Sequence, residues 1–276
     1  MRPVTLQLAD MSDLDIPVLR AEIGGRVSTW PVELHYFPAC ESTNKECQQL
    51  AQHGSIVLAE RQTAGRGRRG NVWHSPLASN IYCSIGLQKT LEARYLGLLS
   101  LQVGICIAQV LREQGFDAAE LKWPNDVLLD GKKLGGILIE TRALTVDTFF
   151  LVIGFGLNVH LDESTIQAIN QPAVSLSQHS ARAINRQLLL AEIISRIMNS
   201  IMQFDLHRID ALLIEFNQYD CLRGLPVVVK NAGQEIHGVH LGIAKTGEIQ
   251  VRTDRGVELF SAAEISLRRA PGDAID

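Results

Sequence analysis

Residues 65–70, GRGRRG, combine three glycines with three arginines and are the most informative stretch for chemistry in this 276-residue chain. Glycine lets the backbone approach a ligand closely, and each guanidinium offers a fixed fork of N–H donors that suits phosphate or carboxylate. We therefore expect a loop that closes over an anionic ligand and excludes water. A solvated basic turn and an RNA-contacting RG segment are the alternatives that this segment alone leaves open.

The same six residues fit the G-x-G-x-x-G fingerprint of dinucleotide-binding folds. That fingerprint opens a helix, whereas here Pro76 and polar residues follow in place of an amphipathic run. Arginine also fills all three variable positions. The context therefore argues against a Rossmann site.

A second candidate segment is LKWPND at residues 121–126, which is followed by a lysine pair at residues 132–133. Because Pro124 cannot continue a strand ladder, we expect Asn125 and Asp126 to lie on a turn. Two glycines follow the lysines, and glycine inside a strand usually marks a close approach of backbone or ligand. An ordinary turn with solvated lysines is the alternative.

A third candidate segment is ESTNKE at residues 41–46. Thr43 with Glu46 three positions later fits the capping box of a helix, so a purely structural role explains it well. A helix start also offers free N–H groups to a polar ligand, and a binding role is compatible with the same pattern.

The elements that must position these segments are short strands and two long helices between residue 31 and about residue 220. The hairpin signal Asp130-Gly131 predicts a pair of antiparallel strands, because both residues tolerate positive φ. Helices are expected over residues 94–114, deeply buried, and from the N-cap Asn185 to residue 204. Strands are expected over residues 55–60, 81–86, 127–129, 134–140 and 149–159.

The pattern changes after Gly224, where five short β-like segments are separated by turn-rich triplets. This spacing predicts a small barrel of about 45 residues and a domain boundary near residue 222. The first 30 residues predict a short helix and a linker. The five segments are residues 226–230, 235–243, 248–252, 258–260 and 265–268.

Composition narrows the class of protein. The formal net charge of −4 argues against a general nucleic-acid binder, and the eight histidines show no metal-ligand spacing. Five scattered cysteines indicate free thiols in a cytoplasmic protein. Aspartates interrupt the N-terminal segment, so it does not resemble a secretory signal, and the longest apolar run, residues 149–159, is too short for a membrane span.

Five motifs, in this order and spacing, resemble the biotin–protein ligase family over about residues 35 to 270. The end of the chain, EISLR at residues 264–268, also resembles the end of the family's C-terminal domain. Phe155 is bulkier than the small residue often found there. The motifs are STN (42–44), QTAGRGRRGNVWHSP (62–76), KWPND (122–126), KLGGILIE (133–140) and GFGLN (154–158).

The resemblance implies an α+β fold. A central mixed β-sheet flanked by helices, like a class II synthetase, would form a catalytic domain over residues 33–221. A small SH3-like β-barrel would follow over residues 222–270. Residues 1–32 would be an N-terminal extension, too short for the DNA-binding winged helix that some family members carry.

The resemblance also implies a two-step reaction with ATP and Mg²⁺, in which biotin becomes biotinyl-5'-AMP and is then passed to a lysine. Lys133 would sit between the biotin carboxylate and the α-phosphate, and no protein metal site is expected. The catalytic residues would be Lys133, Arg68, Lys122 and Asp126. Biotin would contact Ser42, Thr43, Asn44, Gln62, Arg66, Gly67, Arg68 and Lys133. The nucleotide would contact Arg68, Arg69, Trp73, Asn125, Asn158 and Arg268.

The implied acceptor is a biotin carboxyl-carrier domain of a carboxylase. We expect neither DNA nor a membrane as partner, and exposed sheet edges would suit a homodimer. The nearest rival is a lipoate or octanoate ligase, which shares the activation of a carboxylate. The RGRRG loop and the barrel favour biotin. An RG-loop nucleic-acid-binding protein is the more distant alternative, since it would not need Lys133 or residues 122–126.

Overall fold

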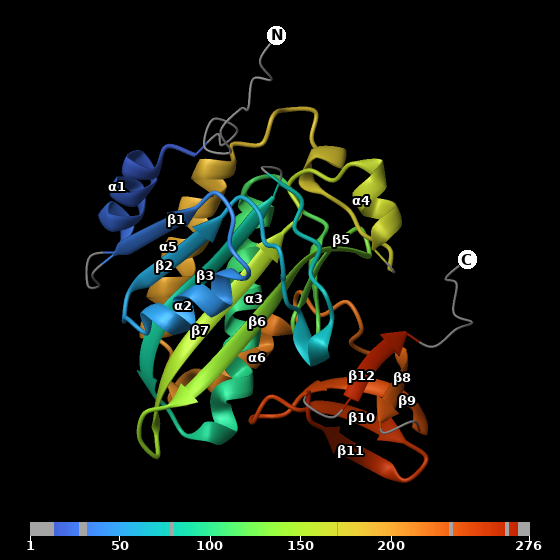
Figure 1. Cartoon of the computed structure of the whole chain (residues 1–276). Coiled ribbons are helices and arrows are strands. Elements are labelled where there is room, and N and C mark those ends of the chain that lie inside the picture. The colour runs from blue at the N-terminus through green and yellow to red at the C-terminus, as the bar shows by residue number, and fades with distance from the viewer. Residues whose placement is uncertain are drawn as a thin grey trace.

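Two separate β-sheets organise the computed structural model, which describes residues 14–27, 32–77, 80–169, 171–231, 234–262 and 265–269 (Figure 1). The larger sheet has seven strands in the spatial order β1-β2-β3-β7-β6-β5-β4. β1 and β2 are parallel and the other neighbours are antiparallel, so the expected mixed sheet is confirmed. The strands are β1 (Glu33–Phe37), β2 (Ser55–Ala59), β3 (Ile81–Thr90), β4 (Ala119–Lys122), β5 (Asp126–Leu129), β6 (Lys132–Ala143) and β7 (Thr148–Leu157).

Helices cover both faces of this sheet. α3, α5 and α6 lie behind it in Figure 1, and α2 lies in front. The main apolar core fills the space between the sheet, α3 and α5, while a smaller cluster lies beneath α2. The helices are α1 (Ile16–Arg26), α2 (Thr43–Leu50), α3 (Leu96–Glu113), α4 (Glu163–Ala168), α5 (Arg186–Met202) and α6 (Ile209–Phe216).

The stretch Ala93–Glu113 contains α3, which confirms the deeply buried helix expected over residues 94–114. By length and composition it could cross a membrane. It is the one such helix in the described part of the chain. Since 61% of its apolar window is buried inside the protein, packing in the core accounts for its composition.

The two strongest local signals are confirmed. Asp130 and Gly131 have φ of 49° and 70° and connect β5 to β6 as a tight hairpin. Asn185 caps α5, its side chain accepting from Leu188 N. β1, α4 and α6 were not expected from the sequence, and each of them spans no more than eight residues.

Two other local expectations are wrong. The N-cap of α2 is Ser42, and no side-chain cap hydrogen bond forms, so Thr43 and Glu46 make no capping box. Thr43 N instead donates to Gln62 Oε1 at 2.9 Å. Asp126 is the first residue of β5 rather than part of a turn, because it pairs with Lys122 on β4.

Alternation along β7 decides which side chains face which layer. Phe155, 4% exposed, belongs to the main core with α3 and α5, whereas Phe150 and Val152 pack on the α2 side. Gly154 and Gly156 continue that second side. The bulk of Phe155 therefore projects into the helix-covered core, and the two glycines leave room in front of the sheet.

The smaller sheet has five strands in the order β11-β10-β9-β8-β12 and fits the expected SH3-like barrel. The domain boundary near residue 222 and the N-terminal extension up to residue 32 stay proposals. Residues 1–13 and 28–31 of that extension lie outside the described part. The strands are β8 (Pro226–Asn231), β9 (Gln234–Ile243), β10 (Ile249–Thr253), β11 (Gly256–Phe260) and β12 (Ile265–Arg269).

The barrel is held against the edge of the larger sheet. Leu121 on β4 pairs in parallel with the linker at Asp220. Asp220 and His240 on β9 form a fully buried pair with Oδ2 2.6 Å from Nε2. The indole of Trp123 donates to the carbonyl of Gly247 at 3.0 Å. These contacts join the barrel to the KWPND segment.

Candidate active site

A cavity of about 1240 Å³ lies in front of the sheet, where residues of all five motifs meet. α2 and the ends of β4, β5, β6 and β7 surround it, and residues 65–72, which we call the flap, cover it. In Figure 1 the flap is the cyan hairpin between the larger sheet and the barrel. The residues that line the cavity include Ser42, Thr43, Asn44, Gln62, Arg66, Gly67, Arg68, Arg69, Trp73, Lys122, Asn125, Asp126 and Lys133.

The flap is a small hairpin rather than a helix start. Gly67 N donates to Asn71 O at 2.7 Å, and Asn71 N donates to Arg68 O at 3.2 Å. Arg69 and Gly70 between them have φ of 57° and 76°, as a type I′ turn requires. A non-glycine residue in this region is strained, and such strain concentrates at functional sites.

Arg68 ties the flap to both domains. Its Nη1 donates to Asn125 Oδ1 at 3.3 Å, and its Nη2 donates to the carbonyl of Ala262 at 2.7 Å. Burial lowers the pKa of the Arg68 guanidinium, and the nearby charge of Asp126 opposes that shift. An arginine remains protonated at neutral pH even so, and the cavity therefore holds a fixed positive charge.

Lys133 supplies a second cation from the returning strand of the hairpin. Its Nζ lies 2.7 Å from Asp126 Oδ1 and 5.7 Å from the centre of the Trp73 ring. Both partners of the ion pair are about one-fifth exposed, so they are in reach of a ligand in the cavity. The carboxylate therefore fixes the position of the ammonium group.

A buried polar cluster lies on the α2 side of the cavity. Gln62 Oε1 accepts from Thr43 N at 2.9 Å, and Gln62 Nε2 donates to Ser75 Oγ at 3.0 Å. The hydroxyl of Ser84 on β3 lies 2.8 Å from Thr43 Oγ1 and 2.6 Å from Asn44 Oδ1. These groups are fixed by one another, which suits recognition of a neutral polar group.

Asn44 uses both amide hydrogens within the protein. Its Nδ2 donates to Glu140 Oε2 at 2.7 Å and to the carbonyl of Leu138 at 3.2 Å. Its Oδ1 lies against the Ser84 hydroxyl, so toward a ligand Asn44 can act only as an acceptor. Gly154 makes this placement feasible, because a Cβ there would lie 2.0 Å from Asn44 Oδ1.

Trp73 forms one wall of the cavity next to β7. A Cβ on Gly156 would lie 2.7 Å from the indole, so only glycine fits beneath the ring. The indole Nε1 is buried and has no hydrogen-bond partner among the described residues. A buried donor without a partner is costly, and a ligand acceptor in the cavity would satisfy it.

Two predicted site residues are not brought into this cluster. Asn158 does not line the cavity; its amide donates to the carbonyl of Val174 at 3.2 Å and fixes the following loop. Arg268 lies on β12, and its side chain is outside the described part of the structure. Ser84, Glu140 and Ala262 had no role expected from the sequence. Ser84 carries no local signal, since it reaches the site only through pairing with Gly154 on β7.

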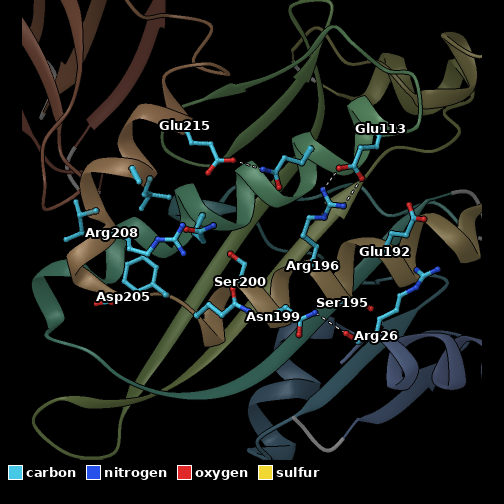
Figure 2. Close-up of a pocket in the computed structure, with 17 residues that line it drawn as sticks. Arg26, Glu113, Glu192, Ser195, Arg196, Asn199, Ser200, Asp205, Arg208 and Glu215 are labelled. Atoms are coloured by element: carbon cyan, nitrogen blue, oxygen red, sulfur yellow. Dashed lines mark hydrogen bonds and ion pairs between the residues drawn. The ribbon is translucent and has the colours of Figure 1, made fainter. Parts of the chain in front are cut away.

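A second cavity, of about 700 Å³, lies among α3, α5 and α6, away from the motifs (Figure 2). Some of its lining side chains pair with one another: Arg196 and Glu113 form a close ion pair at 2.6 Å, and Gln109 donates to Glu215 at 2.5 Å. None of the motif residues lines it. The chemistry therefore belongs to the cavity under the flap.

The site combines fixed cations, one carboxylate and a buried hydrogen-bonding cluster beneath a hairpin rich in glycine and arginine. That combination, on a mixed sheet followed by an SH3-like barrel, defines a protein of the biotin and lipoate ligase class. The family model "Biotin/lipoate A/B protein ligase family" matches residues 36–158. The model "Biotin protein ligase C terminal domain" matches residues 224–268.

Individual relatives agree with these matches. The bifunctional ligase/repressor BirA of Escherichia coli is 34% identical over 85% of this chain and 74% of that relative. The biotin–[acetyl-CoA-carboxylase] ligase of Mycobacterium tuberculosis is 29% identical over 91% of this chain and 95% of that relative. The structure of biotin protein ligase from Aquifex aeolicus in complex with biotin and ATP superposes with a TM-score of 0.70, with 26% identity over 86% of this chain and 99% of that one. The chain belongs to the biotin protein ligase family.

Proposed function

We propose that this protein activates biotin with ATP, forming biotinyl-5'-AMP and pyrophosphate, and then transfers biotin to a lysine of a carrier protein. The observation that carries the proposal is that Arg68 of the flap and Lys133 of the β5–β6 hairpin line one cavity together with the polar cluster at Thr43 and Asn44. Relatives named biotin–[acetyl-CoA-carboxylase] ligase and neighbours solved with biotin and ATP support it. The lipoate alternative is not favoured.

The polar cluster suits the head of biotin, a cyclic urea with N–H donors and a carbonyl acceptor. Asn44 Oδ1 can accept from a urea N–H, while Ser42 and Thr43, at the start of α2, offer hydroxyl groups. Gln62 holds the backbone of Thr43 in place. In this arrangement the biotin carboxylate would extend toward the cations.

In the first half-reaction one biotin carboxylate oxygen attacks the α-phosphorus of ATP, and the bond to the β-phosphate oxygen breaks. Two anions must approach, and negative charge grows on the phosphoryl oxygens. Lys133 and Arg68 stabilise that charge because they are already fixed by Asp126 and Asn125. The flap backbone at Gly67 and the Arg66 side chain would close over the bound acid.

The nucleotide would occupy the side of the cavity formed by Arg69, Trp73 and Asn125. The Trp73 ring offers a stacking surface and an indole donor without a partner. Asn158 does not line the cavity, so the proposal includes no direct contact between Asn158 and the nucleotide. A contact between Arg268 and the nucleotide stays a prediction.

Mg²⁺ would enter with the ATP phosphates. The described residues contain no group of three side chains that could hold a metal ion alone. Mg²⁺ usually binds through one or two carboxylates together with substrate phosphates, and Asp126 in the cavity fits that requirement. When bound, the ion would neutralise phosphate charge.

In the second half-reaction the amine of the acceptor lysine attacks the mixed anhydride, and AMP leaves. The amine must be neutral to attack, so a nearby carboxylate that accepts a proton helps. Asp126 is that group in our proposal, with Lys122 beside it on β4 to stabilise the departing phosphate. We propose a biotin carboxyl-carrier domain as the acceptor.

The setting of the enzyme is part of the proposal. All five cysteines are free, which fits the cytoplasm. A homodimer through a sheet edge stays a proposal, testable by sedimentation. The proposed function is ligation without DNA binding. A specific gel shift of operator DNA by this protein at physiological salt would contradict that restriction.

Pyrophosphate release with ATP, Mg²⁺ and either biotin, lipoate or octanoate tests the substrate. We expect release with biotin at a rate far above that with the two fatty acids. Equal or greater release with lipoate or octanoate would make the protein a ligase for those acids. If none of the acids supports pyrophosphate release, the ligase function is refuted. Nucleic-acid binding by the flap is then the alternative.

A further inference from the structure

Glu140 on β6 makes contacts that the proposed reaction does not use. Its side chain is about one-quarter exposed. Its Oε2 accepts from Asn44 Nδ2 at 2.7 Å, and its Oε1 lies 3.3 Å from Arg66 Nη2. A single carboxylate thus joins α2, which carries the polar cluster, to the base of the flap.

We propose that Glu140 is a positioning residue that couples closure of the flap to the orientation of the Asn44 amide. The proposal rests on the proposed function, because its consequence concerns retention of biotin and of the biotinyl-adenylate. It assigns to Glu140 no contact with the reacting atoms.

The Asn44 side of the coupling follows from the hydrogen-bond pattern. The acceptors Glu140 and Leu138 O hold the amide nitrogen toward β6, so the oxygen is presented on the other side, near Ser84. Without Glu140 the nitrogen keeps only the contact with Leu138 O, the longer of the two. The acceptor that a urea N–H needs would then lose its fixed direction.

The flap side follows from where the flap is held. Arg68 fastens its tip to Asn125 and to the carbonyl of Ala262. Arg66, two residues earlier on the same arm of the hairpin and nearer its base, is fastened by Glu140. If the Glu140 contact is lost, the flap is held through Arg68 and through packing of Trp73 on Gly156, and its base can open more often.

Charge is the second way in which Glu140 affects closure of the flap. Arg66, Arg68 and Lys133 line one cavity, and like charges repel when no anion is bound. Glu140 offsets the charge of Arg66, so less repulsion opposes closure of the flap. The same carboxylate orients the Asn44 amide for biotin.

The test compares Glu140→Gln, which keeps an acceptor for Asn44 but removes the charge, with Glu140→Ala, which removes both. Cleavage of the ligand-free protein by trypsin after the flap arginines reports opening. We expect Glu140→Gln to be cut about two- to fivefold faster than wild type, the range that a partly exposed ion pair supports. Release of biotinyl-adenylate should rise by the same factor.

Glu140→Ala should in addition raise the KM for biotin, while kcat for pyrophosphate release stays within about twofold of wild type in both variants. Glu113→Gln is the matched control, because it breaks a close arginine pair with Arg196 beside the second cavity (Figure 2). We expect no change in flap cleavage or adenylate release from it.

Wild-type cleavage and release rates in both Glu140 variants would overturn the proposal. A fall in kcat with unchanged release would also overturn it, since that result indicates a direct role in chemistry. The cleavage comparison needs no ligand. It therefore decides the coupling to the flap even if the wild-type protein releases no pyrophosphate with biotin, a result that would refute the proposed function instead.

Discussion

Lys133 is one of the two cations that stabilise negative charge in the proposed first half-reaction. Replacing it with alanine removes a preorganised cation from the cavity and leaves Asp126 without its 2.7 Å partner. We expect pyrophosphate release with biotin to fall on the order of 10²- to 10³-fold, as for loss of one such donor. Stopped-flow or coupled pyrophosphate detection measures it.

The neighbouring Lys132→Ala is the control for Lys133→Ala, since Lys132 is exposed and does not line the cavity. It should retain wild-type release. Near-wild-type release by Lys133→Ala would remove Lys133 from the chemistry.

Arg68→Gly tests the tip of the flap. It removes the contacts with Asn125 and with the carbonyl of Ala262. A hydrogen bond to a charged group is worth about 1.5–3 kcal/mol, so leakage of biotinyl-adenylate into solvent should increase on the order of 10- to 100-fold. Chromatography of the free adenylate measures the leak, and unchanged release would show that Arg68 does not close the flap.

At the residue scale, sequence patterns could identify the members of the site but not their partners. Arg68, Lys133 and Asp126 stand in motifs whose residue types suggest anion chemistry. Ser84 and Ala262 join the site only through strand pairing and domain packing, which leave no local trace. Asn158 was expected to contact the nucleotide because of its position in a motif. It does not line the cavity, because its side chain is buried beside Val174.

At the element scale, β7 shapes the cavity because two of its residues, Gly154 and Gly156, have no side chain. Gly154→Ala would place a methyl group 2.0 Å from Asn44 Oδ1, so Asn44 must move. Displacing a positioning residue by about 1 Å costs on the order of 100-fold in rate, and we expect a loss of that size in adenylate formation with weaker biotin binding. Calorimetry with biotin measures the binding.

Gly25→Ala serves as the control for Gly154→Ala, because a Cβ at Gly25 meets no atom within 4 Å. It should bind biotin as wild type does. Unchanged biotin binding in Gly154→Ala would show that the polar cluster is not the biotin site.

The elements themselves were largely predictable because their signals are local. Asp130-Gly131 specifies a hairpin, and Asn185 caps α5, whatever the rest of the chain does. The capping box at Thr43 was wrong because a tertiary contact with Gln62 competes for the same backbone N–H. The parallel pairing of β1 with β2, which are joined through α2, had no signal of that kind.

At the scale of the whole molecule, the barrel completes the site through Ala262, and the buried pair of Asp220 and His240 fixes its attachment. His240→Ala leaves Asp220 buried without that partner. Removing one partner of a buried pair costs about 3–5 kcal/mol, and we expect a loss of that size in the free energy of unfolding in urea.

The exposed pair of Lys245 and Asp210 spans the same junction and is the matched control. Its side chains are about 70% exposed, so Lys245→Ala should cost less than about 1 kcal/mol. Equal losses in the two variants would show that the buried pair does not hold the barrel in place.

Incubation with ATP, Mg²⁺, biotin and a biotin carboxyl-carrier domain, followed by mass measurement of the carrier, tests the proposed reaction as a whole. We predict a gain of one biotinyl group on a single lysine, with none when ATP is omitted or that lysine is replaced by arginine. A carrier of unchanged mass, under conditions in which a known biotin ligase modifies it, would contradict the proposed function.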